Sequence, residues 1–232
     1  MIEWTLAGVR PSVLLCPDTE GPQEGGDRPA GTMGGLPRLP KGMAWPGEGL
    51  PLVATVDCAA LPEGSVDLAL PHDGHLLLFS DFDDFVDAVL VHVPAGTETV
   101  ELEPAYTSGD GTAWDITVHE PRPLRALRVE SFDHAQGPEA LQEFVAAGEA
   151  NEEAVTAFGE EIDEILGSFP PALLRLGGTS RYFQNTPEED GLTHVVTAFG
   201  DPLGNPCHLA LAGTPQDIAA GRYENLTYYL EA

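Results

Sequence analysis

The sequence predicts an α+β fold with mainly antiparallel sheets, and three observations point to this class. Short apolar or alternating runs bounded by glycine and proline recur along the chain and are typical of strands, as at 52–56, 75–79 and 97–103. A helical period is sustained over only one long stretch, around 138–167. Glycine (26) and proline (21) together make up about a fifth of the 232 residues, which indicates many tight turns.

Strands are expected through most of the chain. Residues 2–7 and 9–16 predict two of them, and because Pro11 has no amide donor, the second should lie at a sheet edge or begin just after the proline. Residues 17–31 hold mostly Gly, Pro and acidic residues and predict a surface loop. The later strands are expected at 52–56, 75–79, 88–93, 97–103, 115–119, 124–129, 193–198, 208–212 and 223–231.

The segment from Gly34 to Pro46 is expected to organise the fold. Its glycine pair permits backbone angles that are closed to other residues, and its prolines each fix φ. We therefore expect an extended ribbon that lays Leu36, Leu39 and Trp45 against an apolar core.

Helices are expected in two places. A two-helix insert is predicted around 138–167, where apolar residues recur on one helical face and acidic residues fill the other. Asn151 is suited to cap the second of these helices, and Thr214 is suited to cap a short helix over 215–220.

Two parts of the sequence are alike in the order of their features. Gly34-Gly35, a strand at 54–57 and the run from His75 are followed later by Gly177-Gly178, a strand at 196–199 and the run from His208. This predicts a single domain over 1–232 with two similar halves, about 1–130 and 170–232, joined by the helical segment 138–167. Chance similarity is the alternative.

These motifs resemble the YwqG-like family of bacterial proteins, which has no established activity. The likeness rests on Arg10-Pro11, the 34–46 segment and the 70–79 strand, and more weakly on 176–178, 184–185 and the segment around Asp217. Family members look to carry a glutamine in each of two central strands, where this chain has Thr55 and Thr197, and the family's glutamine-cysteine ending is absent. The resemblance implies a mainly antiparallel α+β fold and brings no reaction with it.

The net charge of −28 limits the classes of partner. With 38 acidic residues against 10 basic ones, the surface repels phosphate, so we expect no nucleic acid and no anionic membrane as partner. One interpretation is a solvated surface that keeps the protein soluble. The other is an acidic inhibitor or immunity-type protein, whose carboxylates on 81–103 and 149–164 capture a basic protein partner.

Several motifs are missing from the sequence, and their absence predicts the cellular compartment and limits metal and disulfide chemistry. No signal peptide is visible and no apolar run approaches the ~20 residues that span a bilayer, so we expect a cytoplasmic protein. Three cysteines without C-x-x-C spacing predict neither a disulfide framework nor a zinc knuckle. We expect no metal and no cofactor, and the sequence indicates no oligomeric state.

Candidate binding residues are few, and we identify no catalytic residue. We favour a non-enzymatic binding or interaction module. A carboxylate-based or metal-dependent enzyme is a less favoured alternative, in which Asp57, His75 and Asp81 would converge in one pocket. Trp45 is favoured as a packed anchor over a ligand platform. The candidate ligand- or partner-binding residues are Trp45, Asp57, His75, Asp81, Arg181, Gln184 and Asn185.

Overall fold

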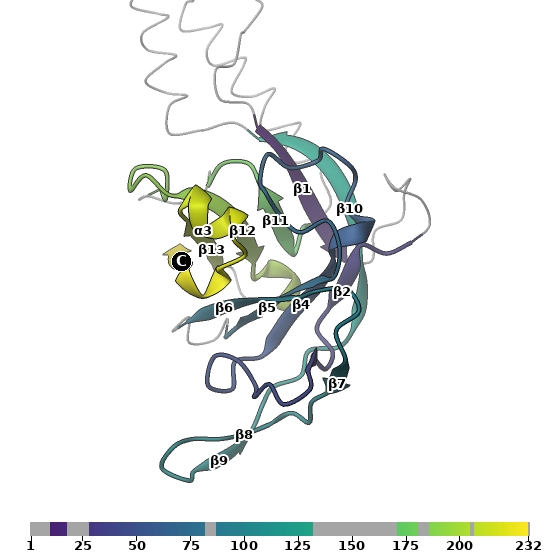
Figure 1. The fold of residues 1–232 in the computed structure, drawn as a ribbon, viewed down its shortest axis with the longest axis vertical. Coiled ribbons are helices and arrows are strands. Elements are labelled where there is room, and N and C mark those ends of the chain that lie inside the picture. Colours follow the sequence, from purple (N-terminus) through teal and green to yellow (C-terminus); the bar gives the residue numbers. More distant parts are fainter. Residues whose placement is uncertain are drawn as a thin grey trace, which may run out of the picture.

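The computed structural model describes residues 10–17, 28–81, 87–131, 171–180, 186–204 and 207–231. Ten strands within these ranges form one large sheet, in which every neighbouring pair is antiparallel (Figure 1). The order across the sheet is β14-β13-β12-β11-β1-β10-β2-β4-β5-β6. The strand bounds are β1 Arg10–Pro17, β2 Gly31–Met33, β4 Leu52–Asp57, β5 His75–Ser80, β6 Ala88–Val93, β10 Arg122–Ser131, β11 Leu174–Gly177, β12 Thr193–Phe199, β13 His208–Gly213 and β14 Thr227–Glu231.

Two small ribbons and a few short helices complete the described part of the chain. One ribbon pairs β3 (Arg38–Pro40) with β7 (Thr99–Glu101), and the other pairs β8 (Ala105–Thr107) with β9 (Ala113–Asp115). The β8–β9 hairpin extends away from the large sheet at the bottom of Figure 1. The helical elements are η1 (Cys58–Ala60), η2 (Asp201–Leu203), α3 (Pro215–Ala219) and η3 (Tyr223–Asn225).

The predicted α+β class is wrong. The described residues form a β-rich fold around one large, nearly closed antiparallel sheet, and the α-helix among them is the five-residue α3. The antiparallel pairing agrees with the prediction, but the two-helix insert expected around 138–167 lies outside the described residues. Helix α3 begins where Thr214 predicts, because the Thr214 side chain accepts a hydrogen bond of 3.1 Å from the Asp217 amide.

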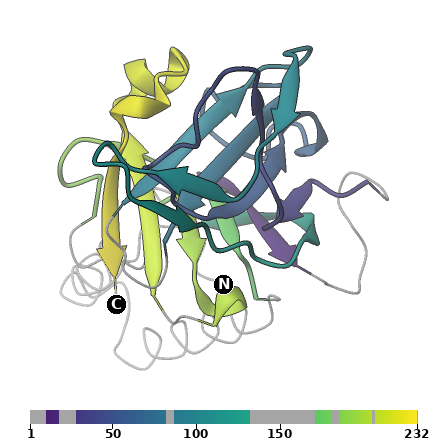
Figure 2. The same cartoon turned by 90° about the horizontal axis from the view of Figure 1, so that it is seen from below.

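The main hydrophobic core lies inside the curl of the large sheet (Figure 2). Its buried side chains come from both halves of the sheet, as shown by Leu15 of β1, Leu76 of β5 and Leu209 of β13. His92 of β6 meets Tyr223 of η3 with ring centroids 6.4 Å apart, so the edge strand β6 approaches the segment before β14. Each large side chain buried here contributes roughly 1.5–3 kcal/mol.

Strand β5 is buried on both faces, as its unbroken apolar run predicts. Leu76 and Leu78 face the main core, whereas Leu77 and Phe79 belong to a second core on the outer face of the sheet. Side chains alternate between the faces of a strand, so a strand covered on both sides needs apolar residues at every position.

The segment 34–46 packs on this outer face and buries Leu39 and Trp45 in the second core as predicted, whereas Leu36 is half-buried and belongs to neither core. Leu39 is fully buried and Trp45 is 8% exposed. The Trp45 indole N–H donates to the Leu50 carbonyl at 2.7 Å, and its ring lies edge-on to Phe79 with centroids 6.2 Å apart. Trp45 is therefore the packed anchor of the second core.

The pairing order repeats on the two sides of the central β1–β10 pair. On one side β10 is followed by β2, β4, β5 and β6, and on the other β1 is followed by β11, β12, β13 and β14. The second strand of each series leads into two glycines with positive φ, 34–35 and 177–178. Thr55 and Thr197 occupy matching register positions in the third strands. Duplication of the two halves, about 1–130 and 170–232, stays a prediction.

Three strand predictions need correction. The strand expected at 223–231 is reduced to β14, because Tyr223–Asn225 forms the 3-10 helix η3. Strand β1 lies at the centre of the sheet between β10 and β11, although its ladder with β11 begins only at Ser12, after the proline. The strand expected at 115–119 is replaced by β9, which ends at Asp115. The strand expected at 2–7 lies outside the described residues.

Candidate functional site

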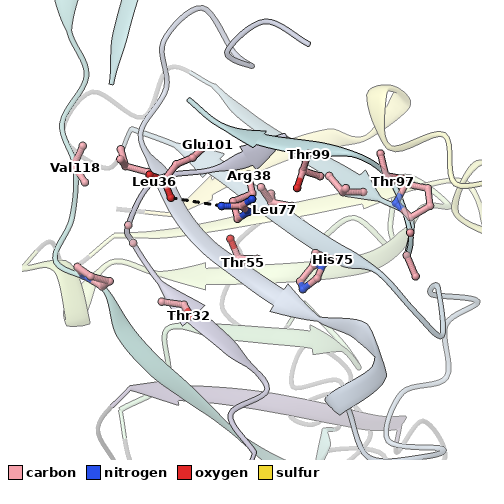
Figure 3. A pocket seen from close by; sticks show the side chains of 17 residues that line it. Thr32, Leu36, Arg38, Thr55, His75, Leu77, Thr97, Thr99, Glu101 and Val118 are labelled. Carbon is pink, nitrogen blue, oxygen red and sulfur yellow. Dashed lines mark ion pairs between the residues drawn. The ribbon is translucent and has the colours of Figure 1, made fainter. Parts of the chain in front are cut away.

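A groove of about 680 Å³ lies between the outer face of the sheet and the β3–β7 ribbon (Figure 3). Its floor is one row of register partners, in which Thr32 of β2 pairs with Thr55 of β4, and Thr55 pairs with Leu77 of β5. His75 and Val93, which pair across β5 and β6, extend the floor by a second row. The floor is therefore set by the register of three ladders within the large sheet.

The opposite wall is formed by the ribbon and the turn before it. Thr99 and Glu101 of β7 line the groove together with Arg38 of β3. Arg38 and Glu101 lie directly opposite each other in the ribbon and form an ion pair of 4.0 Å, drawn dashed in Figure 3. Their side chains are 64% and 55% exposed, so the pair contributes at most about 1 kcal/mol to stability. Its two charges offset each other at the groove.

The glycine pair 34–35 carries the chain from the floor strand β2 toward the ribbon strand β3. Both glycines line the groove and have φ values of 62° and 81°, in the left-handed region that other residues avoid. A Cβ atom on Gly34 would lie 2.6 Å from the carbonyl oxygen of His119. The Gly35 amide donates to that same oxygen at 3.0 Å. This close approach holds the segment containing Val118 and Pro121 beside the groove.

The lining is mainly apolar with dispersed hydroxyl groups. Leucine, valine, proline, alanine and glycine supply most of it, and four threonines supply the hydroxyls. The ionisable side chains among the seventeen are Arg38, His75 and Glu101. The full lining is Thr32, Gly34, Gly35, Leu36, Arg38, Thr55, His75, Leu77, Val93, Pro94, Ala95, Gly96, Thr97, Thr99, Glu101, Val118 and Pro121.

Of the sequence-predicted candidates, His75 lines the groove and Asp57 lies beside it in a structural role. Asp57 pairs with His75 across β4 and β5. Its Oδ1 accepts a hydrogen bond of 3.1 Å from the Ala59 amide and caps η1, while its Oδ2 forms an ion pair with Arg28. The carboxylate is thus engaged by local structure and does not orient the imidazole.

The enzyme hypothesis requires Asp57, His75 and Asp81 to meet in one pocket. The structure does not bring these three residues together. Asp57 is next to His75 at the start of β5, but Asp81 follows the other end of that strand. Asp81 lies six positions after His75 along extended chain, which corresponds to roughly 20 Å. Arg181, Gln184 and Asn185 lie outside the described residues.

Metal ligation and the two buried thiols, Cys16 and Cys58, can be judged in the part of the chain that the structure describes. There, no group of three or more His, Cys, Asp or Glu side chains is placed to hold a metal ion. Cys16 and Cys58 are buried, and burial raises the pKa of each thiol to about 11. A thiol with such a pKa has almost no thiolate at neutral pH and is a poor nucleophile.

Reasoning from the sequence missed most of the groove. Thr32, Thr99 and Val118 carry no motif, because isolated threonines and valines are ordinary strand residues. One signal was present at Thr55, where the chain departs from the glutamine that the YwqG-like resemblance leads one to expect. That position lies on the floor of the groove.

The fold and the groove define a β-rich protein with an open, mostly apolar groove on the outer face of its sheet. Residues 32–192 match the family described as "Domain of unknown function (DUF1963)", and the chain belongs to this family. All groove residues fall inside the matched range, whereas β12, β13, α3 and β14 follow it.

No curated protein matches the chain. Among the helices that the structure describes, none has the length and apolar character needed to cross a membrane.

Proposed function

We propose that this protein is a non-enzymatic binding module of the YwqG-like type, and that the groove between the sheet and the β3–β7 ribbon is its binding site. The observation that carries this proposal is the groove itself, a cavity of about 680 Å³ lined by residues of six strands, β2 to β7. Ligand pockets in proteins occupy roughly 300–1,000 Å³ and are mostly apolar with a few placed polar groups. The lining fits that description.

The lining chemistry favours an uncharged ligand that is mostly apolar and carries one or more hydrogen-bonding groups. Leu36, Leu77 and Val118 offer apolar contact. Threonine hydroxyls both donate and accept hydrogen bonds, so Thr55 and Thr99 can meet an amide or hydroxyl group from opposite walls. The Arg38 guanidinium already has Glu101 as its partner, so it is a weak attractor for a ligand anion.

An enzyme is less well supported by the same geometry. General acid–base catalysis needs ionisable groups that reach one reacting atom. In the groove His75 has no acidic partner oriented toward it, since the neighbouring Asp57 carboxylate is held by Ala59 and Arg28.

Ligand-observed NMR tests the proposal. We would screen neutral fragments that join an apolar ring to an amide or hydroxyl group, each with a carboxylate analogue, by saturation transfer from the protein. Thr55→Phe fills the groove floor, and Thr107→Phe is the matched control because Thr107 is exposed on β8 and does not line the groove. Neutral fragments should bind wild type and Thr107→Phe but not folded Thr55→Phe. Fragments that bind all three proteins equally would refute the site.

The net charge of −28 favours a second candidate function, an acidic inhibitor or immunity-type protein that captures a basic protein partner. Steering by charge predicts that capture weakens steeply as salt rises. A partner purified from host lysate at low salt should therefore be lost at high salt. A partner retained equally at both would argue against this function.

A further inference from the structure

We infer that the β8–β9 hairpin is a docking surface for an arginine-bearing basic segment of a protein partner, with Trp114 and Tyr106 as the contact pair. This inference deepens the second candidate function and is independent of the groove. It names the surface and the side-chain chemistry that would be recognised there.

The aromatic pair is built by the register of the hairpin. Tyr106 of β8 lies directly opposite Trp114 of β9, and their ring centroids are 5.0 Å apart. Gly49 supports the pair from the neighbouring loop, since a Cβ atom there would lie 3.1 Å from both the indole Nε1 and the Tyr106 side chain. The position of the indole is therefore fixed by packing rather than left free.

Trp114 is nevertheless 43% exposed, whereas Trp45 is 8% exposed. Of the six large apolar side chains exposed in the described residues, Trp114 is the one on the β8–β9 hairpin. Exposed tryptophan and tyrosine are enriched at contact surfaces, because they offer large area at low entropic cost.

The charge around the pair selects the partner. The stretch 103–120 contains four acidic residues, all exposed, and neither lysine nor arginine. Asp110 lies at the hairpin tip and Asp115 follows Trp114, while Glu48 is exposed on the supporting loop. Hydrogen bonds from Ser108 and the Thr112 amide lower the pKa of Asp110, which stays ionised at neutral pH.

An aromatic pair on a hairpin with exposed carboxylates is suited to guanidinium groups. Arginine stacks on indole and phenol rings and forms bidentate hydrogen bonds with carboxylates, so a segment with several arginines can meet both features. A basic partner of the same net charge whose side chains do not stack on the two rings would gain only the salt-sensitive part of this attraction. The electrostatic field of the acidic protein attracts any basic protein. Recognition at the hairpin therefore adds specificity for arginine.

The test uses the full chain and a capped pentapeptide, Arg-Gly-Arg-Gly-Arg, measured by isothermal titration calorimetry at about 10 mM and about 150 mM salt. A second peptide replaces each arginine with citrulline, which keeps the shape and removes the charge. Trp114→Ala removes the indole without changing the net charge. Tyr228→Ala is the matched control, because Tyr228 is also 43% exposed but lies on β14.

We expect the arginine peptide to bind wild type and Tyr228→Ala equally, to bind Trp114→Ala about two- to fivefold more weakly, and the citrulline peptide not to bind. Equal binding by Trp114→Ala and wild type would overturn the docking surface while leaving acidic capture standing. Absence of binding even at low salt would overturn both. Melting temperatures of the two variants close to that of wild type establish that they are folded.

Discussion

The Gly34→Ala substitution tests how the ribbon is held over the sheet to make the groove. Gly34 has a φ of 62°, and an alanine Cβ would lie 2.6 Å from the His119 carbonyl oxygen and 2.9 Å from its carbon. The left-handed conformation costs an alanine about 1–2 kcal/mol. Forcing the backbone of 118–121 away adds roughly 1–3 kcal/mol, the usual cost of overpacking. We therefore expect a loss of about 2–5 kcal/mol in the free energy of unfolding.

Gly42→Ala is the matched control. Gly42 also has a left-handed backbone, with a φ of 87°, but a Cβ atom there would meet nothing within 4 Å. This variant incurs the conformational cost of about 1–2 kcal/mol alone. Urea denaturation followed by far-UV circular dichroism gives both values by linear extrapolation. Equal destabilisation by the two variants would show that the close approach to His119 carries no energy and would refute the reasoning.

Three further predictions concern stability. Trp45→Ala should cost about 3–5 kcal/mol in denaturation, because it empties the second core, and a loss below about 1 kcal/mol would contradict the anchor role. Thr214→Ala should cost about 1 kcal/mol by removing the cap of α3, and an unchanged melting temperature would contradict it. Burial, followed by the charge of Arg175, lowers the pKa of His194 well below its usual value, so this neutral histidine contributes stability above about pH 6.5 that is lost as pH falls. The unfolding free energy should then fall by up to about 1.4 kcal/mol per pH unit below that point. The control is a His194→Asn variant. A difference in unfolding free energy between wild type and this variant that stays constant from pH 5 to 7 would contradict this account.

Local features of the fold were predictable where one physical cause dominates. The apolar run of β5 predicts burial on both faces, and the structure places it between two cores. The glycine pair 34–35 predicts an unusual backbone, which positive φ values confirm. Thr214 predicts the start of α3, because a side-chain cap is a short-range interaction.

Long-range features were not predictable from the sequence. β1 is paired with β10 over its whole length although more than 100 residues separate them, and no local pattern encodes such a partner. The fold class has a related cause. The helical period around 138–167 favours an α+β class, whereas the described strands assemble into one large sheet through long-range pairing.

The groove residues likewise divide into those that the sequence indicates and those that only the fold brings together. In the sequence, His75 is a candidate because of its chemistry, and Thr55 stands out only as a departure from a family resemblance. Thr32, Thr99 and Val118 become a site only when β2, β4, β5 and β7 are brought together. Asp57 looked like a functional carboxylate in the sequence, but the structure uses it to cap η1 and bind Arg28.

Amide chemical-shift mapping tests the central claim most directly. Isotope-labelled protein would be titrated with a neutral ring-amide fragment that binds wild type in the screen described above. The account predicts that the largest shifts fall on the amides of Thr32, Thr55, His75 and Thr99, which line the groove from both walls. Shifts concentrated on β12, β13 and β14, with these four amides unmoved, would contradict it.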